Sequence, residues 1–191
     1  MLGKIVRGAA LGGILFLILG LIIYNSTRET DFSEKVWDEG TTVGETKAKH
    51  HFVMYTDLAC PYCDVFSRTI MNNEEEFSQL IADNSILYEV RVTEFLYEYG
   101  EGKIDMSRWS AKGVQCAKNE GRFWDYYHQA LKNLWNDYHS KGIGVSKTSP
   151  MITGMTEDYW VKVGKDAGFS EAEFRDCMAK EETIAQVEEG T

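Results

Sequence analysis

The sequence predicts an α/β fold built on a strand, a helix and a second, parallel strand. Two observations predict the strands, because residues 51–56 and 86–92 are runs of mostly apolar and aromatic side chains. A third observation predicts the helix between them: apolar residues recur there at helical spacing, namely Phe66, Ile70, Phe77, Leu80 and Ile81. The pair Asn72-Asn73 predicts a break in this helix. The order strand, helix, strand is typical of a parallel βαβ unit.

Length and composition indicate one globular domain with a short appendage. A chain of 191 residues with 43 % hydrophobic and 26 % charged residues can bury a sizeable core, which argues against disorder. Residues 1–28 carry three basic and no acidic side chains. Residues 29–191 therefore hold 17 Lys and Arg against 30 Asp and Glu, a net charge of −13. Electrostatic binding to nucleic acid needs a basic face, so no nucleic-acid partner is expected.

The N-terminus predicts a membrane anchor over residues 1–28. Lys4 and Arg7 precede an uncharged, largely apolar stretch at residues 8–27. As a helix this stretch would rise roughly 30 Å, which is the thickness of a bilayer core. The basic residues before it predict a single-pass protein with a cytoplasmic N-terminus and with residues 29–191 extracytoplasmic. A cleaved signal peptide and a buried helix are the alternatives, but no clear small-x-small cleavage site follows, and the stretch is apolar all round.

The remaining chain divides into a tether, the βαβ unit and a helical part. Residues 29–49 are polar and are interpreted as a tether, with a short edge strand considered around Thr41–Val43. Residues 93–189 are predicted to be mainly helical, with a loop at residues 142–155. One helix face in this part is apolar and aromatic and is interpreted as core packing: Phe123, Tyr127, Ala130, Leu131 and Leu134.

The residues that carry chemistry are Cys60, Pro61, Tyr62 and Cys63. Two cysteines separated by two residues at a helix start lie one turn apart on one face, close enough to form a disulfide. Pro61 suits the first helical turn, where its missing N–H costs nothing. Cys60 would face the unpaired amides and positive dipole end of the helix, which lower the pKa of a thiol, so we predict that it is the nucleophile. Cys63, one turn further in, would resolve the mixed disulfide that Cys60 forms.

Metal binding competes with this redox interpretation. A single C-x-x-C is half of a zinc site, and His50 or His51 could add ligands to Cys60 and Cys63, which would make the protein a copper or zinc carrier. The sequence contains no second C-x-x-C, and a zinc knuckle does not usually follow a strand at the start of a helix. A purely structural Cys60–Cys63 disulfide is a further alternative.

The run from Phe52 to Cys63 resembles the active-site strand and helix start of DsbA-like thiol–disulfide oxidoreductases, a thioredoxin-fold family with a helical insertion. Residues 115–128 resemble the insertion segment of the membrane-anchored bacterial members, and residues 174–178 resemble a later part of these proteins. The resemblance implies a DsbA-like thioredoxin domain at residues 50–191, with the helical insertion at about 104–180.

This resemblance implies thiol–disulfide exchange on extracytoplasmic proteins, with Cys60 as the attacking thiol and Cys63 as its resolving partner. The implied partners are cysteine-containing client proteins and a membrane or envelope redox partner, besides the lipid bilayer around residues 8–27. No metal or organic cofactor is expected. A relative of the kappa-class glutathione transferases is an alternative, which the presence of both cysteines disfavours. The dipeptide Pro61-Tyr62 also occurs in glutaredoxins and does not alone decide between oxidant and reductant.

The sequence also departs from the family pattern. Thioredoxin folds complete their sheet with a C-terminal β-hairpin, preceded by a cis-proline loop that packs beside the C-x-x-C. Pro61 and Pro150 are the two prolines of the sequence, and neither precedes a predicted strand. The hairpin and the cis-proline loop are therefore expected to be missing, and the domain is expected to be truncated at its C-terminus.

Cys116 and Cys177 are the remaining cysteines. If Cys60 bonds Cys63, the three pairings that four cysteines allow reduce to one, and an extracytoplasmic domain favours oxidation. We therefore expect a structural Cys116–Cys177 disulfide within the helical insertion. The alternative is two buried thiols that act as small hydrophobic side chains.

Overall fold

The computed structural model describes residues 41–99, 104–146, 148–150 and 152–190. The predicted membrane anchor and most of the predicted tether lie outside these ranges, so both stay predictions. Within the described ranges, none of the helices combines the length and the apolar character that a membrane span requires. The features below belong to one compact unit, which begins at Asp38 and ends at Thr191.

The sheet has the strand order β1-β3-β2 in the described part of the chain. Its strands are β1 (Thr42–Val43), β2 (His50–Thr56) and β3 (Ile86–Val92). β2 and β3 are parallel and in register from His50 opposite Ile86 to Thr56 opposite Val92, which confirms the predicted βαβ unit. β1 pairs with β3 in the antiparallel sense. The edge strand considered around residues 41–43 is therefore part of this sheet, although the sequence placed it in a tether.

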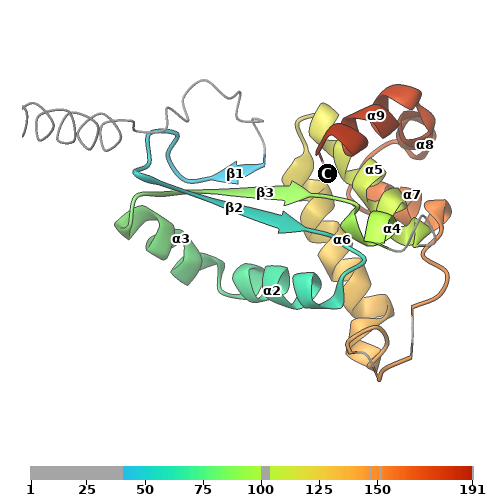
Figure 1. The fold of residues 1–191 in the computed structure, drawn as a ribbon, viewed down its shortest axis with the longest axis horizontal. Helices are drawn as coiled ribbons and strands as arrows, with labels where there is room; N and C mark the ends of the chain where they lie inside the picture. Colours follow the sequence, from blue (N-terminus) through green and yellow to red (C-terminus); the bar gives the residue numbers. More distant parts are fainter. Residues whose placement is uncertain (1–40, 100–103, 147, 151, 191) are drawn as a thin grey trace, which may run out of the picture. The chain divides into compact units, whose positions relative to one another are not determined.

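Two helices connect β2 to β3. They are α2 (Pro61–Asn72) and α3 (Glu74–Asp83), and they are separated at Asn73, as the asparagine pair predicted. Both helices run along the same face of the sheet (Figure 1). Phe77 of α3 packs edge-on against Tyr88 of β3, with ring centroids 5.0 Å apart. The carboxyl end of β2 therefore leads directly into the amino end of α2, where the C-x-x-C begins.

The rest of the described chain is mainly helical, as predicted, and its helices surround one central helix. Its elements are α4 (Phe95–Tyr99), α5 (Asp105–Asn119), α6 (Phe123–Asp137), η1 (His139–Lys141), α7 (Glu157–Asp166), α8 (Glu171–Ala179) and α9 (Glu181–Gly190). α5 contacts α4, α6, α7, α8 and α9, and these helices gather at one end of the sheet (Figure 1). These helices lie between residues 95 and 190, which matches the mainly helical part predicted for residues 93–189.

Large apolar side chains form the core between these helices. Tyr126, Trp160 and Phe174 are fully buried, and Tyr126 stacks on Phe174 with ring centroids 5.3 Å apart. A Cβ atom at Gly113 of α5 would collide with the hydroxyl of Tyr126, so a glycine lets α5 and α6 approach closely. α6 also contacts α2, and the helical part therefore supports the helix that carries the C-x-x-C.

Candidate active site at the C-x-x-C helix

The C-x-x-C opens helix α2 as the sequence predicted. Cys60 is the N-cap residue, with extended dihedral angles, and Pro61 is the first helical residue. The Cys60 carbonyl accepts a hydrogen bond from the Asp64 N–H at 3.1 Å, which begins the helical pattern. Both Cys60 and Cys63 are half-buried free thiols, and the side chain between them, Tyr62, is 66 % exposed. A disulfide-bearing substrate can therefore approach this pair from solvent.

The two thiols share one hydrogen-bonded proton, and this controls their ionisation. The hydrogen bond from Cys60 lowers the pKa of Cys63 to about 6, against the opposing effect of burial, and the Thr56 hydroxyl lowers it further. The same hydrogen bond, together with burial, raises the pKa of Cys60 although the backbone amides of Cys63 and Tyr62 act to lower it. Because one proton is shared, the first ionisation belongs to the pair.

In the reduced pair the pKa of Cys63 is lowered, whereas the sequence predicted a lowered pKa for Cys60. The prediction considered the amides at the start of the helix and omitted the second thiol, one turn away. In the structure the amides of Tyr62 and Cys63 do act on Cys60, but the neighbouring thiol has the larger effect. The dithiol therefore releases its first proton readily and its second with difficulty.

Asp57 is a buried acid three residues before Cys60, and the sequence interpretation gave it no role. Its Oδ1 accepts a hydrogen bond from the Ala59 N–H at 2.8 Å, and its Oδ2 accepts from the Leu96 N–H at 3.0 Å and from the Ser107 hydroxyl at 2.5 Å. Burial raises the pKa of Asp57 despite these donors. A negative charge on Asp57 acts to raise the pKa of Cys63. The sequence shows an acidic residue directly after the strand that leads to the C-x-x-C, and this position could have marked Asp57 as a candidate site residue.

Polar contacts fasten α2 to the helical part of the molecule. Asp64 is buried, and its Oδ2 lies 2.6 Å from His139 Nδ1 and accepts a hydrogen bond from Arg68 Nε at 2.9 Å. The Arg68 guanidinium also lies 4.0 Å from the ring centroid of Trp135 on α6. His139 is 75 residues from Asp64 in the sequence, so no local motif could have revealed this pair.

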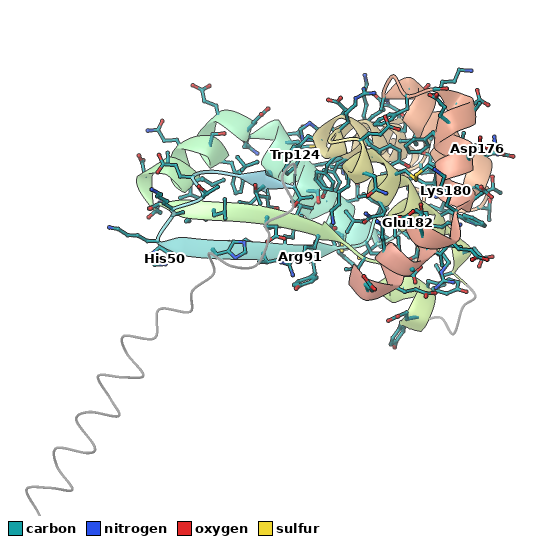
Figure 2. All side chains as sticks on the ribbon, turned by 90° about the horizontal axis from the view of Figure 1, so that it is seen from above. His50, Arg91, Trp124, Asp176, Lys180 and Glu182 are labelled. Atoms are coloured by element: carbon teal, nitrogen blue, oxygen red, sulfur yellow. A yellow bond between two sulfur atoms is a disulfide. The ribbon has the colours of Figure 1, made fainter. Side chains whose placement is uncertain are left out.

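The structure separates the residues of the metal-carrier alternative. His50 and His51 begin β2, whereas Cys60 follows its end, and the strand from His51 to Thr56 spans roughly 16 Å. Zinc bonds to nitrogen and sulfur are about 2.0–2.3 Å long, so these residues cannot share one ion in this fold. His51 Nε2 instead lies 2.9 Å from a carboxylate oxygen of Glu89. Figure 2 shows His50 at the end of the sheet remote from Asp176 of α8.

Among the described residues, no group of three or more His, Cys, Asp or Glu side chains lies close enough together to hold a metal ion. Among these residues, the Cys60–Cys63 pair therefore has no third ligand of these types.

Cys116 and Cys177 form a disulfide in the structure. The bond joins α5 to α8 across 61 residues of sequence, with Cα atoms 6.0 Å apart. Cys116 is completely buried in the helical part. The structure thus holds a buried bridge in addition to the half-exposed Cys60–Cys63 pair.

The rate of alkylation of the reduced protein is expected to rise as a thiolate forms near pH 6, because the pKa of Cys63 in the pair is lowered to about 6. Below that pH the dithiol is protonated and unreactive, so the rate should rise about tenfold per pH unit and level off above it. The check is the rate of iodoacetamide labelling against pH, with peptide mapping of the adduct. A rate that continues to rise to about pH 8.5, as for free cysteine, would contradict this expectation.

The fold and the site together define a class: a thioredoxin-fold protein with a dithiol at the start of its first core helix. A family model described as Thioredoxin matches residues 37–190, and the chain belongs to this family. The predicted thioredoxin-like α/β fold with a helical insertion is thereby confirmed. No curated protein sequence matches the chain.

Several solved structures share this fold at low sequence identity. BdbD from Bacillus subtilis, in its oxidised form, is 18 % identical over 80 % of this chain and 72 % of that chain, with a TM-score of 0.56. A thioredoxin-like oxidoreductase from Silicibacter pomeroyi is 13 % identical over 78 % of this chain and 68 % of that chain, with a TM-score of 0.51. MdbA from Corynebacterium diphtheriae, a thiol-disulfide oxidoreductase, is 20 % identical over 80 % and 73 % of the two chains, with a TM-score of 0.50.

Proposed function

We propose that this protein catalyses thiol–disulfide exchange on cysteine-containing client proteins through Cys60 and Cys63. The observation that carries the proposal is the geometry of the pair: two half-exposed free thiols, one turn apart, open one helix. The printed description of MdbA as a thiol-disulfide oxidoreductase supports the same activity.

Cys60 is the attacking sulfur in this proposal. Apart from Cys60, the residues that influence the pKa of Cys63 are Thr56 and Asp57, which are both buried. The backbone amides of Cys63 and of the exposed Tyr62 act to lower the pKa of Cys60. A client disulfide therefore meets Cys60 first, and the shared proton moves to Cys63 when Cys60 attacks.

Exchange then takes two steps. The Cys60 thiolate attacks one sulfur of the client disulfide, a mixed disulfide forms, and the other client sulfur leaves as a thiolate. Cys63 attacks the mixed disulfide at Cys60, which releases the client in the dithiol form and leaves a Cys60–Cys63 disulfide. The reverse sequence oxidises a client, and a separate membrane or envelope redox partner resets the pair in either direction.

The proposal includes an extracytoplasmic location for residues 29–191, with residues 8–27 as a membrane anchor. The uncharged, apolar stretch after Lys4 and Arg7 supports the anchor and its orientation. The Cys116–Cys177 disulfide supports the location, because such bonds persist in oxidising compartments and are rare in the cytosol.

The proposal is tested by replacing Cys63 with serine. Without its resolving thiol the variant should accumulate a mixed disulfide between Cys60 and a client, because the second step cannot proceed. Nonreducing electrophoresis and peptide mapping after incubation with a disulfide-bonded client would detect the adduct. An adduct confined to another cysteine, or turnover equal to that of the unaltered protein, would disprove the proposed roles.

A further inference from the structure

A cavity lies between the sheet, the active-site helix and the helical part of the molecule. It has a volume of about 340 Å³ and is lined by residues of β1, β2, β3, α2, α3 and α6. This volume is within the range of small-molecule sites in proteins. Neither Cys60 nor Cys63 is among the lining residues, so the cavity is separate from the dithiol.

The walls of the cavity are mainly apolar and aromatic. Phe77, Tyr88 and Trp124 contribute rings from α3, β3 and α6. Met54 and Met71 contribute thioether side chains from β2 and α2. Methionine has a flexible chain and a polarisable sulfur, and it packs well against aromatic rings. These walls therefore suit the body of a small aromatic ligand.

One buried hydroxyl in these walls has a poor partner. Tyr88 is 4 % exposed, and its hydroxyl donates to the Met54 sulfur at 3.1 Å. A thioether sulfur is a weak acceptor, and a buried donor without a good acceptor costs free energy. Burial raises the pKa of Tyr88 to about 12, so the phenol stays protonated and keeps its hydrogen to donate. An oxygen acceptor inside the cavity would give this hydroxyl a stronger hydrogen bond.

A pair of buried hydroxyls lines the same cavity. Ser67 Oγ and the Tyr127 hydroxyl lie 2.7 Å apart, and both residues are almost completely buried. Their mutual hydrogen bond uses one of their two hydrogens, so the pair has a second hydrogen to donate. The cavity thus combines apolar walls with a few buried donors, which is typical of small-molecule sites.

The charges around the cavity narrow the class of ligand. Among the described residues that line it, Glu74 has the single formal charge, and this residue is exposed on α3. Its carboxylate disfavours an anionic ligand. Burial lowers the pKa of His128, so this ring is neutral at neutral pH and supplies no positive charge for an anion. An uncharged ligand is therefore favoured.

We propose that this cavity binds an uncharged aromatic molecule whose ketone or amide oxygen accepts a hydrogen bond from Tyr88. The acceptor replaces the Met54 sulfur as the partner of this hydroxyl, and the rings of Phe77 and Trp124 contact the aromatic body. Binding is noncovalent. The site does not depend on the proposed exchange function, because neither reactive cysteine lines it.

The test titrates acetophenone, an aromatic ketone, into the full chain and follows isotope-labelled methionine methyl groups by nuclear magnetic resonance. Met54 and Met71 line the cavity, whereas Met155 and Met178 are buried but do not line it. The signals of Met54 and Met71 should shift along a saturable curve, while those of Met155 and Met178 stay in place. Shifts of all four signals, or shifts without saturation, would show that the ligand has no such site.

Two tryptophan substitutions on α3 test the place of binding. Ser78 is exposed and lines the cavity, whereas its exposed neighbour Gln79 does not line it. Ser78→Trp should obstruct the cavity and weaken acetophenone binding by about tenfold or more, which is about 1.4 kcal/mol. Gln79→Trp should leave the affinity unchanged. Equal affinities of the two variants would overturn the proposal.

A further variant tests the hydrogen bond from Tyr88. Tyr88→Phe should weaken acetophenone binding about three- to tenfold, the usual effect of one buried hydrogen bond. It should not weaken ethylbenzene, which has a similar shape and no acceptor. The matched control is Tyr126→Phe, because the Tyr126 phenol is buried, donates to the Trp160 carbonyl at 3.2 Å and does not line the cavity. Equal losses for both ligands would disprove the proposed ligand class.

If Tyr88→Phe does not fold, Met54→Leu makes the same comparison in the opposite direction. The change removes the competing sulfur acceptor and nearly conserves volume, which cores tolerate well. Acetophenone should then bind about threefold more tightly relative to ethylbenzene, with Met71 as the remaining reporter in the cavity. An unchanged ratio of the two affinities would show that Tyr88 does not donate to the ligand.

Discussion

Replacing Cys60 with serine is expected to reduce the rate of client disulfide exchange to that of the solution without protein. The loss should be about three orders of magnitude or more, as for the removal of a catalytic nucleophile in general. A serine hydroxyl does not ionise near neutral pH and cannot form a disulfide. We expect no replacement by Cys63, because Cys63 lies one turn inside α2 whereas Cys60 caps the start of the helix. Turnover of a fluorogenic disulfide substrate would measure the effect.

The Cys63→Ser variant is the control for this experiment. It keeps Cys60 at the helix start, so it should still open one client disulfide per molecule before it stops. If Cys60→Ser forms the stable client adduct and Cys63→Ser does not, the roles of the two sulfurs are reversed. Such a result would agree with the lower pKa of Cys63 in the reduced pair.

Removal of the Cys116–Cys177 bridge is expected to lower the free energy of unfolding by about 4 kcal/mol. This value follows from the loop entropy that the bridge removes from the unfolded chain, given the sequence separation of 61 residues. Since domains of this size are stable by only about 5–15 kcal/mol, the loss is a large fraction of the total. Urea unfolding of the double variant Cys116→Ala and Cys177→Ala, followed by circular dichroism, measures it.

The matched control replaces Cys60 and Cys63 with alanine. These two thiols are free in the structure, so their removal takes away no cross-link and should change stability by about 1 kcal/mol at most. A bridge variant as stable as this control would show that the Cys116–Cys177 bond does not constrain the unfolded chain. A steeper urea slope for the bridge variant would agree with a less compact unfolded state once the cross-link is removed.

Local patterns in the sequence predicted the elements that position the dithiol. The apolar runs at residues 51–56 and 86–92 marked the two parallel strands, and Pro61 marked the first turn of α2. These predictions succeed because strand burial and helix starts depend on neighbouring residues. The short strand β1 could be predicted from its own residues for the same reason. Its place in the sheet, however, depends on pairing with β3.

The parts of the site that were missed depend on contacts between distant segments. Asp64 meets His139 across 75 residues, and Ser67 meets Tyr127 across 60. Helical spacing showed that Tyr127 faces the interior, but spacing does not show what a hydroxyl at the end of a ring touches. The helix-start argument considered the Cys60 thiol by itself, whereas the two thiols interact and their first ionisation belongs to the pair.

The attachment of α2 to α6 and η1 has a consequence for how such proteins are compared. Dithiol proteins are often sorted by the two residues between their cysteines, here Pro61 and Tyr62. In this chain, Ser67 and Asp64 attach the inner side of α2 to α6 and η1. Residues outside the C-x-x-C signature therefore also influence the reactivity of the two thiols. Two homologues with identical signatures can therefore diverge in reactivity through changes in α6 alone.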